Sequence, residues 1–293
     1  MSPERSGRDR FWIRAAAGAA RAVSLALFPD TCLCCGAFVD ARADRSKNET
    51  APETAGTEPC RLSGKEMFAS AAAGKLCPAC MQAFAPVRSP FCTRCGLSFR
   101  SRAGDNHLCG RCLSGEKPFV FARSCGAYTA TLQTLIHAYK YHGKTGIGHL
   151  LGDLLYRNFL KHFKNEPIGM VVPVPLHRRK LVSRGFDQVF HMLDQWPWEK
   201  TNGFRKTSTG AVLAEKALVR TKHTDSQTGL DRKKRAVNMK SAFAVPQAGM
   251  VADKAVLLTD DVYTTGATLE ACAETLLRAG AAKVYFLTLA RAM

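Results

Sequence analysis

The chain has 293 residues, of which 46% are hydrophobic and 23% are charged, as is usual for a globular protein with a sizeable core. Lysine and arginine number 42 against 24 aspartate and glutamate residues, so the formal net charge is +18. This surplus favours anionic partners such as phosphorylated metabolites, nucleic acid or an acidic surface, although a solvated basic surface gives the same count. No stretch approaches about 18 uncharged apolar residues, so we expect no transmembrane helix.

The first apolar segment, residues 11–28, is rich in alanine but is interrupted by Arg14 and Arg21. A signal peptide would need a small-residue cleavage site after it, and none follows before the first cysteines. We therefore predict a short amphipathic helix at residues 12–27, within an N-terminal segment of residues 1–29, and a cytoplasmic protein.

Cysteine is abundant, with 12 residues, and most of them form a repeat. Each unit is CxxCG followed by LCxxC: CLCCG with LCPAC, then CTRCG with LCGRC. Two CxxC turns together complete a tetrahedral zinc site. The repeat favours sequential pairing into two structural sites, formed by Cys32, Cys35, Cys77 and Cys80, and by Cys92, Cys95, Cys109 and Cys112. Cross-braced pairing stays open, and disulfides are the alternative for an exported chain.

A polar stretch at about residues 40–73 separates the two halves of the first unit and shows little periodicity, so we predict a flexible insertion there. Cys34 and Cys60 are left over, and either is a substitute ligand. We assign residues 30–116 to a double zinc ribbon, whose small core depends on metal for its stability.

The remaining residues, 118–293, alternate between strand and helix patterns. Apolar residues at helical spacing predict helices at residues 128–141, 147–163 and 269–278. Short apolar runs predict strands at residues 170–174, 255–259 and 284–289. Strand, helix and strand in that order predict a right-handed βαβ unit in a mostly parallel sheet, and therefore an α/β fold.

The most informative stretch is VLLTDDVYTTGAT at residues 256–268. An apolar strand ends in Asp260 and Asp261, a loop of small and hydroxyl residues follows, and a helix begins near Thr268. Free N–H groups at a helix start suit a phosphate, and Gly266 lets the backbone approach the anion closely. The paired acids suit vicinal ribose hydroxyls, or water on Mg²⁺. The alternative is an ordinary strand-to-helix turn with solvated acids.

This stretch closely resembles the phosphoribosyl pyrophosphate (PRPP) signature of type I phosphoribosyltransferases. The resemblance implies a parallel core sheet with a smaller hood, a 5′-phosphate held at residues 264–268, and Mg²⁺ bound together with PRPP. The candidate residues for PRPP are Asp260, Asp261, Tyr263, Thr264, Thr265, Gly266, Ala267 and Thr268. Of these, Asp260 and Asp261 would hold the ribose hydroxyls and, through water, the magnesium ion.

Other segments resemble the ComF family of competence-associated proteins, which commonly opens with zinc-binding cysteine pairs. They are PVPL at residues 173–176, RGFDQ at 184–188, IHAYKY at 136–141, and Arg220, Thr221, Gln227, Leu230, Arg235, Asn238, Ala242 and Phe243. The chain departs from the family pattern at Asp187, where asparagine is usual, at Thr259, where an apolar residue is usual, and at residues 196–210.

Positive charge gathers in residues 177–187 and 200–240. In the first segment, Arg184 and Gly185 are candidates for contact with pyrophosphate. The second is a flap that closes on the substrate, a nucleic-acid surface, or a solvated basic face. Lys140 and His142 stand beside Gly143 at the end of a predicted helix, where a role near phosphate is one interpretation and a surface lysine is the commoner outcome.

These observations support three functions. The ComF resemblance implies a protein that binds PRPP or a related ribose phosphate and takes part in DNA uptake during natural transformation, with single-stranded DNA and competence proteins as partners. An active phosphoribosyltransferase in nucleotide salvage is the first alternative. A non-catalytic adaptor that binds single-stranded DNA and keeps a vestigial pocket is the second.

Overall fold

The computed structural model describes residues 30–39, 62–144, 146–201, 203–221 and 242–292. The predicted N-terminal helix and Cys60 lie outside the described residues, as does much of the basic segment at 200–240. The same holds for four residues of the family pattern, Gln227, Leu230, Arg235 and Asn238. Within the described ranges, no helix is long and apolar enough to cross a membrane.

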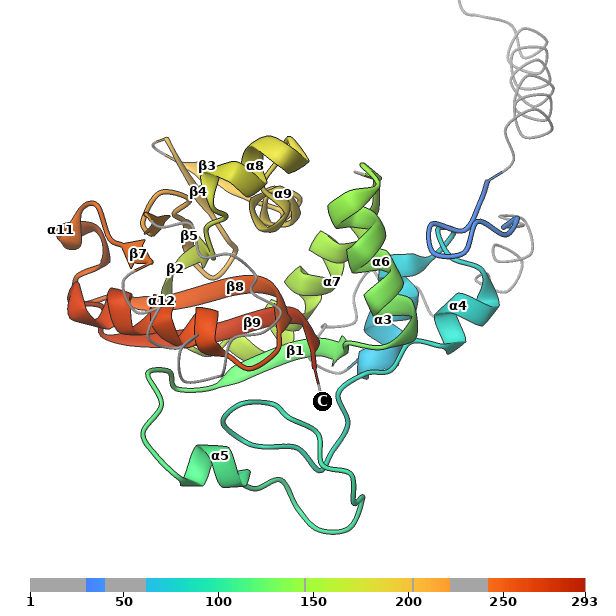
Figure 1. Ribbon diagram of the computed structural model, residues 1–293, viewed down its shortest axis with the longest axis horizontal. Coiled ribbons are helices and arrows are strands. Elements are labelled where there is room, and N and C mark those ends of the chain that lie inside the picture. The colour runs from blue at the N-terminus through green and yellow to red at the C-terminus, as the bar shows by residue number, and fades with distance from the viewer. Residues whose placement is uncertain (1–29, 40–61, 145, 202, 222–241, 293) are drawn as a thin grey trace, which may run out of the picture.

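A seven-stranded sheet with the strand order β1-β9-β8-β2-β5-β4-β3 lies at the centre of the protein (Figure 1). Its parallel strands are β1 (Ala122–Ala127), β9 (Lys283–Arg291), β8 (Ala255–Tyr263), β2 (Ile168–Pro173) and β5 (Val212–Leu213). β4 (Phe204–Lys206) and β3 (Glu199–Thr201) extend the sheet in antiparallel fashion. A separate antiparallel ribbon joins β6 (Val219–Arg220) and β7 (Phe243–Ala244). The predicted α/β class with a mostly parallel sheet is confirmed.

The described helices are α3 (Gly64–Ala72), α4 (Pro78–Gln82), α5 (Gly110–Leu113), α6 (Ala130–Tyr141), α7 (Gly146–Phe163), α8 (Arg178–Arg184), α9 (Gln188–Asp194), α11 (Ala248–Val251) and α12 (Ala267–Arg278). They divide between the two faces of the sheet. Leu257 of β8 and Leu287 of β9 share one buried cluster with α3, α6, α7 and α9. Val256, Leu258 and Phe286 share another cluster with α12. Because successive strand residues point to opposite faces, β8 and β9 are buried on both sides.

The predicted helices and strands of the second half match the structure closely. In α7, Ile147, Leu150, Leu151 and Leu154 recur every three or four residues, and each is fully buried. The helix α12 ends at Arg278, followed by Gly280 with φ of +97°, a conformation that suits glycine beyond a helix end. Strands β8 and β9 flank α12 in the chain and pair in parallel, as a βαβ unit requires.

The predicted flexible insertion is wrong at its C-terminal end. Residues 64–72 form α3, and its Met67 and Phe68 are buried against the core shared with α7. The helix begins with a capping box, in which the Ser63 hydroxyl accepts from the Glu66 N–H and the Glu66 carboxylate accepts from the Ser63 N–H. The sequence carried this signal, since Ser63 stands three residues before Glu66 and an apolar pair follows.

Candidate ribose-phosphate site and zinc ribbons

The strand β8 continues through the two acids, whereas the sequence predicted that it would end at them. Its pairing with β9 extends to Tyr263 opposite Arg291, so the connecting loop is only residues 264–266. Thr264 and Thr265 are exposed, and Gly266 caps α12 with φ of +90°. The first turn of α12 therefore opens toward solvent with N–H groups that have no partner within the helix. This loop and helix start form a site suited to an anion.

Tyr263 does not face this opening, although it was among the predicted PRPP-binding residues. Its side chain is 1% exposed and lies beneath the loop, where the Arg291 guanidinium stacks on the ring at 3.9 Å. A Cβ added at Gly266 would lie 2.6 Å from the ring carbon Cε2 of Tyr263. The tyrosine thus supports the loop from below, and only glycine fits above it.

Asp260 and Asp261 are adjacent in the strand, so their side chains point to opposite faces of the sheet. The Oδ2 atom of Asp261 pairs with Lys140 Nζ of α6 at 2.6 Å. It also accepts from Gln188 Nε2 of α9 at 3.1 Å. The Asp261 side chain is 9% exposed and that of Lys140 is 17% exposed. The second acid is therefore held in place by two helices, each from a different part of the chain.

Asp260 has different surroundings. Its Oδ1 accepts from the Asp261 backbone N–H at 2.8 Å, and no cation of the described residues forms an ion pair with it. Part of its surface stays accessible. Burial, and then the charge of the neighbouring Asp261, raise the pKa of Asp260 to about 8. A carboxyl group in this state either keeps its proton or binds a cation that arrives with a ligand.

The RGFDQ segment connects to the acids through a chain of hydrogen bonds. Arg184 Nη1 donates to Gln188 Oε1 at 2.7 Å, and Gln188 in turn donates to Asp261. Arg184 Nη2 donates to the Tyr141 hydroxyl at 3.2 Å. Gly185 ends α8 with φ of +79°, which permits the sharp turn into α9. Arg184 is thus linked to Asp261 through one intervening side chain, as suits a residue expected at the pyrophosphate.

The Asp187 carboxylate caps α9 by accepting from the N–H groups of Val189 and Phe190, each at 3.0 Å. An asparagine, usual in the ComF family at this position, offers the same acceptor oxygen. The departure from the family pattern therefore leaves the cap intact.

Sequence reasoning missed Gln188 and Tyr141 as members of this site, and for Lys140 it favoured a surface position over a role near phosphate. The contacts join α6, α9 and β8, which are far apart in the chain, and no local periodicity reports such contacts. A usable signal existed, because Lys140 and Tyr141 stand in the IHAYKY segment and Gln188 ends RGFDQ.

A basic pocket of about 580 Å³ lies beside α8 and the β6–β7 ribbon. It is lined by His177, Arg178, Arg179, Val182, Arg220 and Thr221. The cations of this region crowd one another: burial, and then the charges of Arg220 and Arg184, lower the pKa of Lys180. Such mutual repulsion is relieved when an anion binds among the cations.

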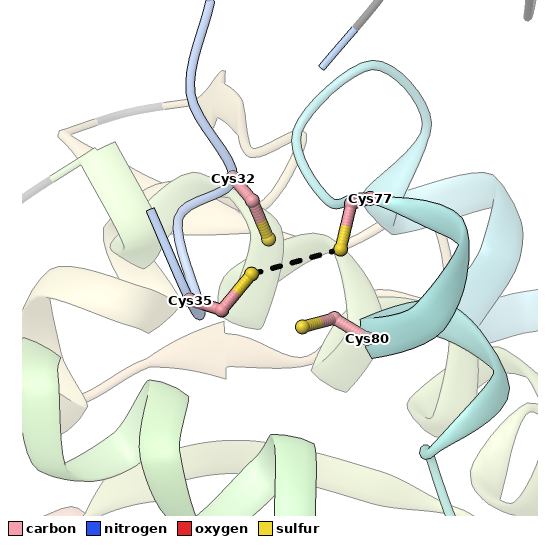
Figure 2. Close-up of side chains that lie close together, drawn as sticks. All are labelled: Cys32, Cys35, Cys77 and Cys80. Atoms are coloured by element: carbon pink, nitrogen blue, oxygen red, sulfur yellow. Dashed lines mark hydrogen bonds between the residues drawn. The ribbon is translucent and has the colours of Figure 1, made fainter. Parts of the chain in front are cut away.

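The cysteines of the repeat gather in the sequential arrangement. In each set, the ligand atoms all lie within 4.8 Å of one another. Figure 2 shows the first set, with the side chains of Cys32 and Cys35 pointing toward those of Cys77 and Cys80 at α4. The second set is Cys92, Cys95, Cys109 and Cys112, and all four are buried.

The geometry of both sets fits zinc. The Sγ–Sγ distance is 3.7 Å between Cys35 and Cys77, and 3.8 Å between Cys95 and Cys109. Tetrahedral Zn–S bonds of about 2.3 Å place the sulfur atoms about 3.8 Å apart. Cys92 Sγ also accepts from the N–H groups of Cys95 and Cys109, which stabilises a thiolate.

Comparison with known proteins finds a matching domain both for the zinc ribbons and for the part of the chain that contains Asp260 and Asp261. A double zinc ribbon domain matches residues 58–113, and a phosphoribosyl transferase domain matches residues 208–293. The chain is therefore a double-zinc-ribbon protein with a phosphoribosyltransferase-type domain.

The most informative relatives are three bacterial proteins. The chain is 30% identical over 228 residues to the DNA utilization protein YhgH of Escherichia coli strain K12, covering 74% of this chain and 91% of the relative. Identity to the protein of the same name from Salmonella typhi is 30% over 227 residues, with the same coverage. Identity to competence protein F of Haemophilus influenzae is 29% over 225 residues, covering 74% of this chain and 90% of the relative. The chain belongs to the ComF family, as its motifs predicted.

Proposed function

We propose that this protein binds PRPP or a related ribose phosphate at the carboxyl end of β8, and that this binding serves DNA uptake or DNA utilisation. The single observation that carries the proposal is the pair Asp260 and Asp261, followed directly by an exposed hydroxyl-rich loop at a helix start. The names of the relatives, which refer to DNA utilization and competence, support the biological setting.

The 5′-phosphate of the ligand would lie on the loop. The first N–H groups of α12 donate to its oxygens, and the exposed hydroxyls of Thr264 and Thr265 are placed to add further bonds. The ribose hydroxyls would donate to the carboxylates of Asp260 and Asp261.

The pyrophosphate of PRPP would face Lys140, which pairs with Asp261, and the cations whose charges act together with it. Lys140, Lys180 and Arg184 come from α6 and α8, and their charges act on one another. They are suited to hold a multiply charged group and to stabilise it if it departs.

Asp260 fits a role toward Mg²⁺, because it is a carboxyl group of raised pKa without a cation partner in the described part of the chain. When bound, the ion neutralises part of the negative charge of the diphosphate. Asp260 would then lose its proton and accept hydrogen bonds from the waters of the ion, while Lys140 keeps Asp261 oriented.

The proposal is tested by calorimetric titration of PRPP with Mg²⁺ into the full chain and into the double variant Asp260→Asn, Asp261→Asn. Because charge-assisted hydrogen bonds contribute about 1.5–3 kcal/mol each, the double variant should bind at least about 100-fold more weakly. The control is Asp153→Asn, which removes a half-exposed carboxylate that pairs with Arg157 on α7 and should leave the affinity unchanged. Equal binding by wild type and the double variant, or no binding by either, would refute the proposed site.

Phosphoribosyl transfer is the catalytic form of this proposal, in which a nitrogen nucleophile displaces pyrophosphate from PRPP. It is tested by measuring release of pyrophosphate in the presence of purine and pyrimidine bases. Release that depends on both a base and the two acids would establish an enzyme, whereas binding without release would establish a ligand-binding protein.

An adaptor for single-stranded DNA is the second candidate, and the surface around Tyr141 favours it. The Tyr141 side chain is 60% exposed, with the His137 ring at 4.8 Å and the Arg184 guanidinium at 5.1 Å from its ring. Exposed aromatic rings among cations are suited to stacking with unpaired bases. Tyr141→Ala should weaken binding of an oligothymidine about tenfold if this candidate is correct, and unchanged binding would exclude this surface.

A further inference from the structure

The second zinc ribbon directly contacts the loop at residues 264–266, where the phosphate is proposed to bind. Arg111, which stands between the ligands Cys109 and Cys112, donates from Nη2 to the backbone carbonyl of Thr265 at 2.7 Å. A second contact joins Lys117 Nζ to the Glu270 carboxylate in the first turn of α12, at 3.4 Å. The ribbon thus holds the loop, and Lys117, just beyond the ribbon, holds the helix that follows the loop.

A further contact reaches the loop from below. Arg291 is 2% exposed, and its Nη1 donates to the carbonyls of Tyr263 at 2.6 Å and Thr264 at 2.5 Å. No Asp or Glu of the described residues pairs with this buried cation. The loop is therefore held by two arginines, Arg291 from β9 and Arg111 from the ribbon.

The first ribbon has no such connection among the described residues. It packs on the other face of the sheet, where Thr131 of α6 donates to the Cys80 carbonyl at 2.6 Å. The two ribbons have the same ligand pattern but different neighbours, as Figure 1 shows for α4 beside α6 and for α5 below β1.

We infer that the second zinc ribbon is part of the ribose-phosphate site: Arg111, which stands between two zinc ligands, positions the loop at residues 264–266 for its ligand. Arg111 is a positioning residue, because it bonds the loop backbone and leaves the N–H groups of α12 to the ligand. The inference rests on the proposed function for the identity of the ligand, but the positioning itself can be measured without any ligand.

The first experiment measures amide hydrogen exchange of the peptide spanning residues 264–268 in the ligand-free, zinc-loaded full chain. Arg111→Met should raise the exchange rate about tenfold, and Arg111→Lys should restore part of the protection. Arg94→Met is the matched control, because Arg94 holds the equivalent position between Cys92 and Cys95, and its backbone carbonyl accepts from Ala122 of β1, away from the loop. Equal exchange in Arg111→Met, Arg94→Met and wild type would overturn the inference, whatever the ligand.

The second experiment compares zinc content and PRPP affinity in the same variants. Arg111→Met should keep both zinc ions and bind PRPP with Mg²⁺ about fivefold more weakly, while Arg94→Met matches wild type. Cys112→Ser should lose one zinc ion and increase loop exchange more than Cys80→Ser does. Failure of wild type to bind PRPP would refute the proposed ligand and leave the exchange result standing, whereas unchanged affinity in Arg111→Met would refute the inference alone.

Discussion

Replacing Gly266 with alanine should destabilise the protein more than the same change at any open turn. The backbone conformation at Gly266, with φ of +90°, costs a residue with a side chain about 1–2 kcal/mol. The new Cβ would also lie 2.6 Å from Cε2 and 3.0 Å from the hydroxyl of Tyr263. That ring is fixed by Arg291 on one side and by Phe286, whose ring meets it edge-on at 6.1 Å.

The total cost follows from these two contributions. Overpacking in a fixed environment costs about 1–3 kcal/mol, so Gly266→Ala should lower the free energy of unfolding by about 2–5 kcal/mol. Gly210 provides the matched control, because its φ is +86° and a Cβ added there would meet no atom within 4 Å. Gly210→Ala should therefore cost only the backbone contribution of about 1–2 kcal/mol.

The assay is urea denaturation of the zinc-loaded protein, followed by circular dichroism. The clash is isolated by a double-variant cycle, since Tyr263→Leu removes the atoms that the new methyl group meets. In the Tyr263→Leu background, Gly266→Ala should cost at least about 1 kcal/mol less than in wild type. Equal losses at Gly266 and Gly210, with strict additivity in the cycle, would refute the packing of the loop on Tyr263.

Three further predictions concern pH and metal. Asp260, with its pKa raised to about 8, keeps its proton in the folded state, so wild-type stability should fall as pH rises from about 4 to 8. Asp260→Asn should remove this fall, so its stability relative to wild type should increase by at least about 1 kcal/mol between pH 5 and pH 8.5 in thermal melts without Mg²⁺. Burial, followed by the charges of Arg123 and Lys161, lowers the pKa of His162 to about 4, so its contribution to stability should be fully present above about pH 6.5 and be lost toward pH 4. Between pH 6.5 and 5, His162→Gln should lose about 1–2 kcal/mol less unfolding free energy than wild type in urea titrations. Metal analysis should find about two zinc ions per chain, and a chelator that removes them should lower the melting temperature by several degrees; one zinc ion or none after purification in reducing buffer would contradict the two-site arrangement.

Much of the fold could be predicted because its patterns are local. The apolar spacing of α7 and the continuous apolar runs of β8 and β9 reflect burial on one face or on both faces, which sequence alone reports. The grouping of the cysteines followed from the repeat, since each CxxC turn prepares two ligands before the chain folds around the metal.

The parts that could not be predicted depend on contacts between distant segments. Arg111 and Thr265 are separated by 154 positions, and no periodicity in either segment reports their bond. The same applies to Lys140 and Asp261, which meet only because α6 packs beside the sheet. Tyr263 belongs to the signature stretch, yet the alternation of β8 sends its ring inward. The boundaries of the zinc-ribbon and phosphoribosyltransferase-type parts stay predictions.

The central claim is that the loop after β8 and the start of α12 bind a sugar phosphate. The most direct measurement is the change in amide chemical shifts of the isotope-labelled full chain on addition of ribose 5-phosphate with Mg²⁺. We expect saturable shifts at Thr265, Gly266, Ala267 and Thr268, with none at the opposite end of the sheet, around Ala255 and Lys283. Shifts confined to other surfaces, or none at the loop at saturating ligand, would contradict this claim.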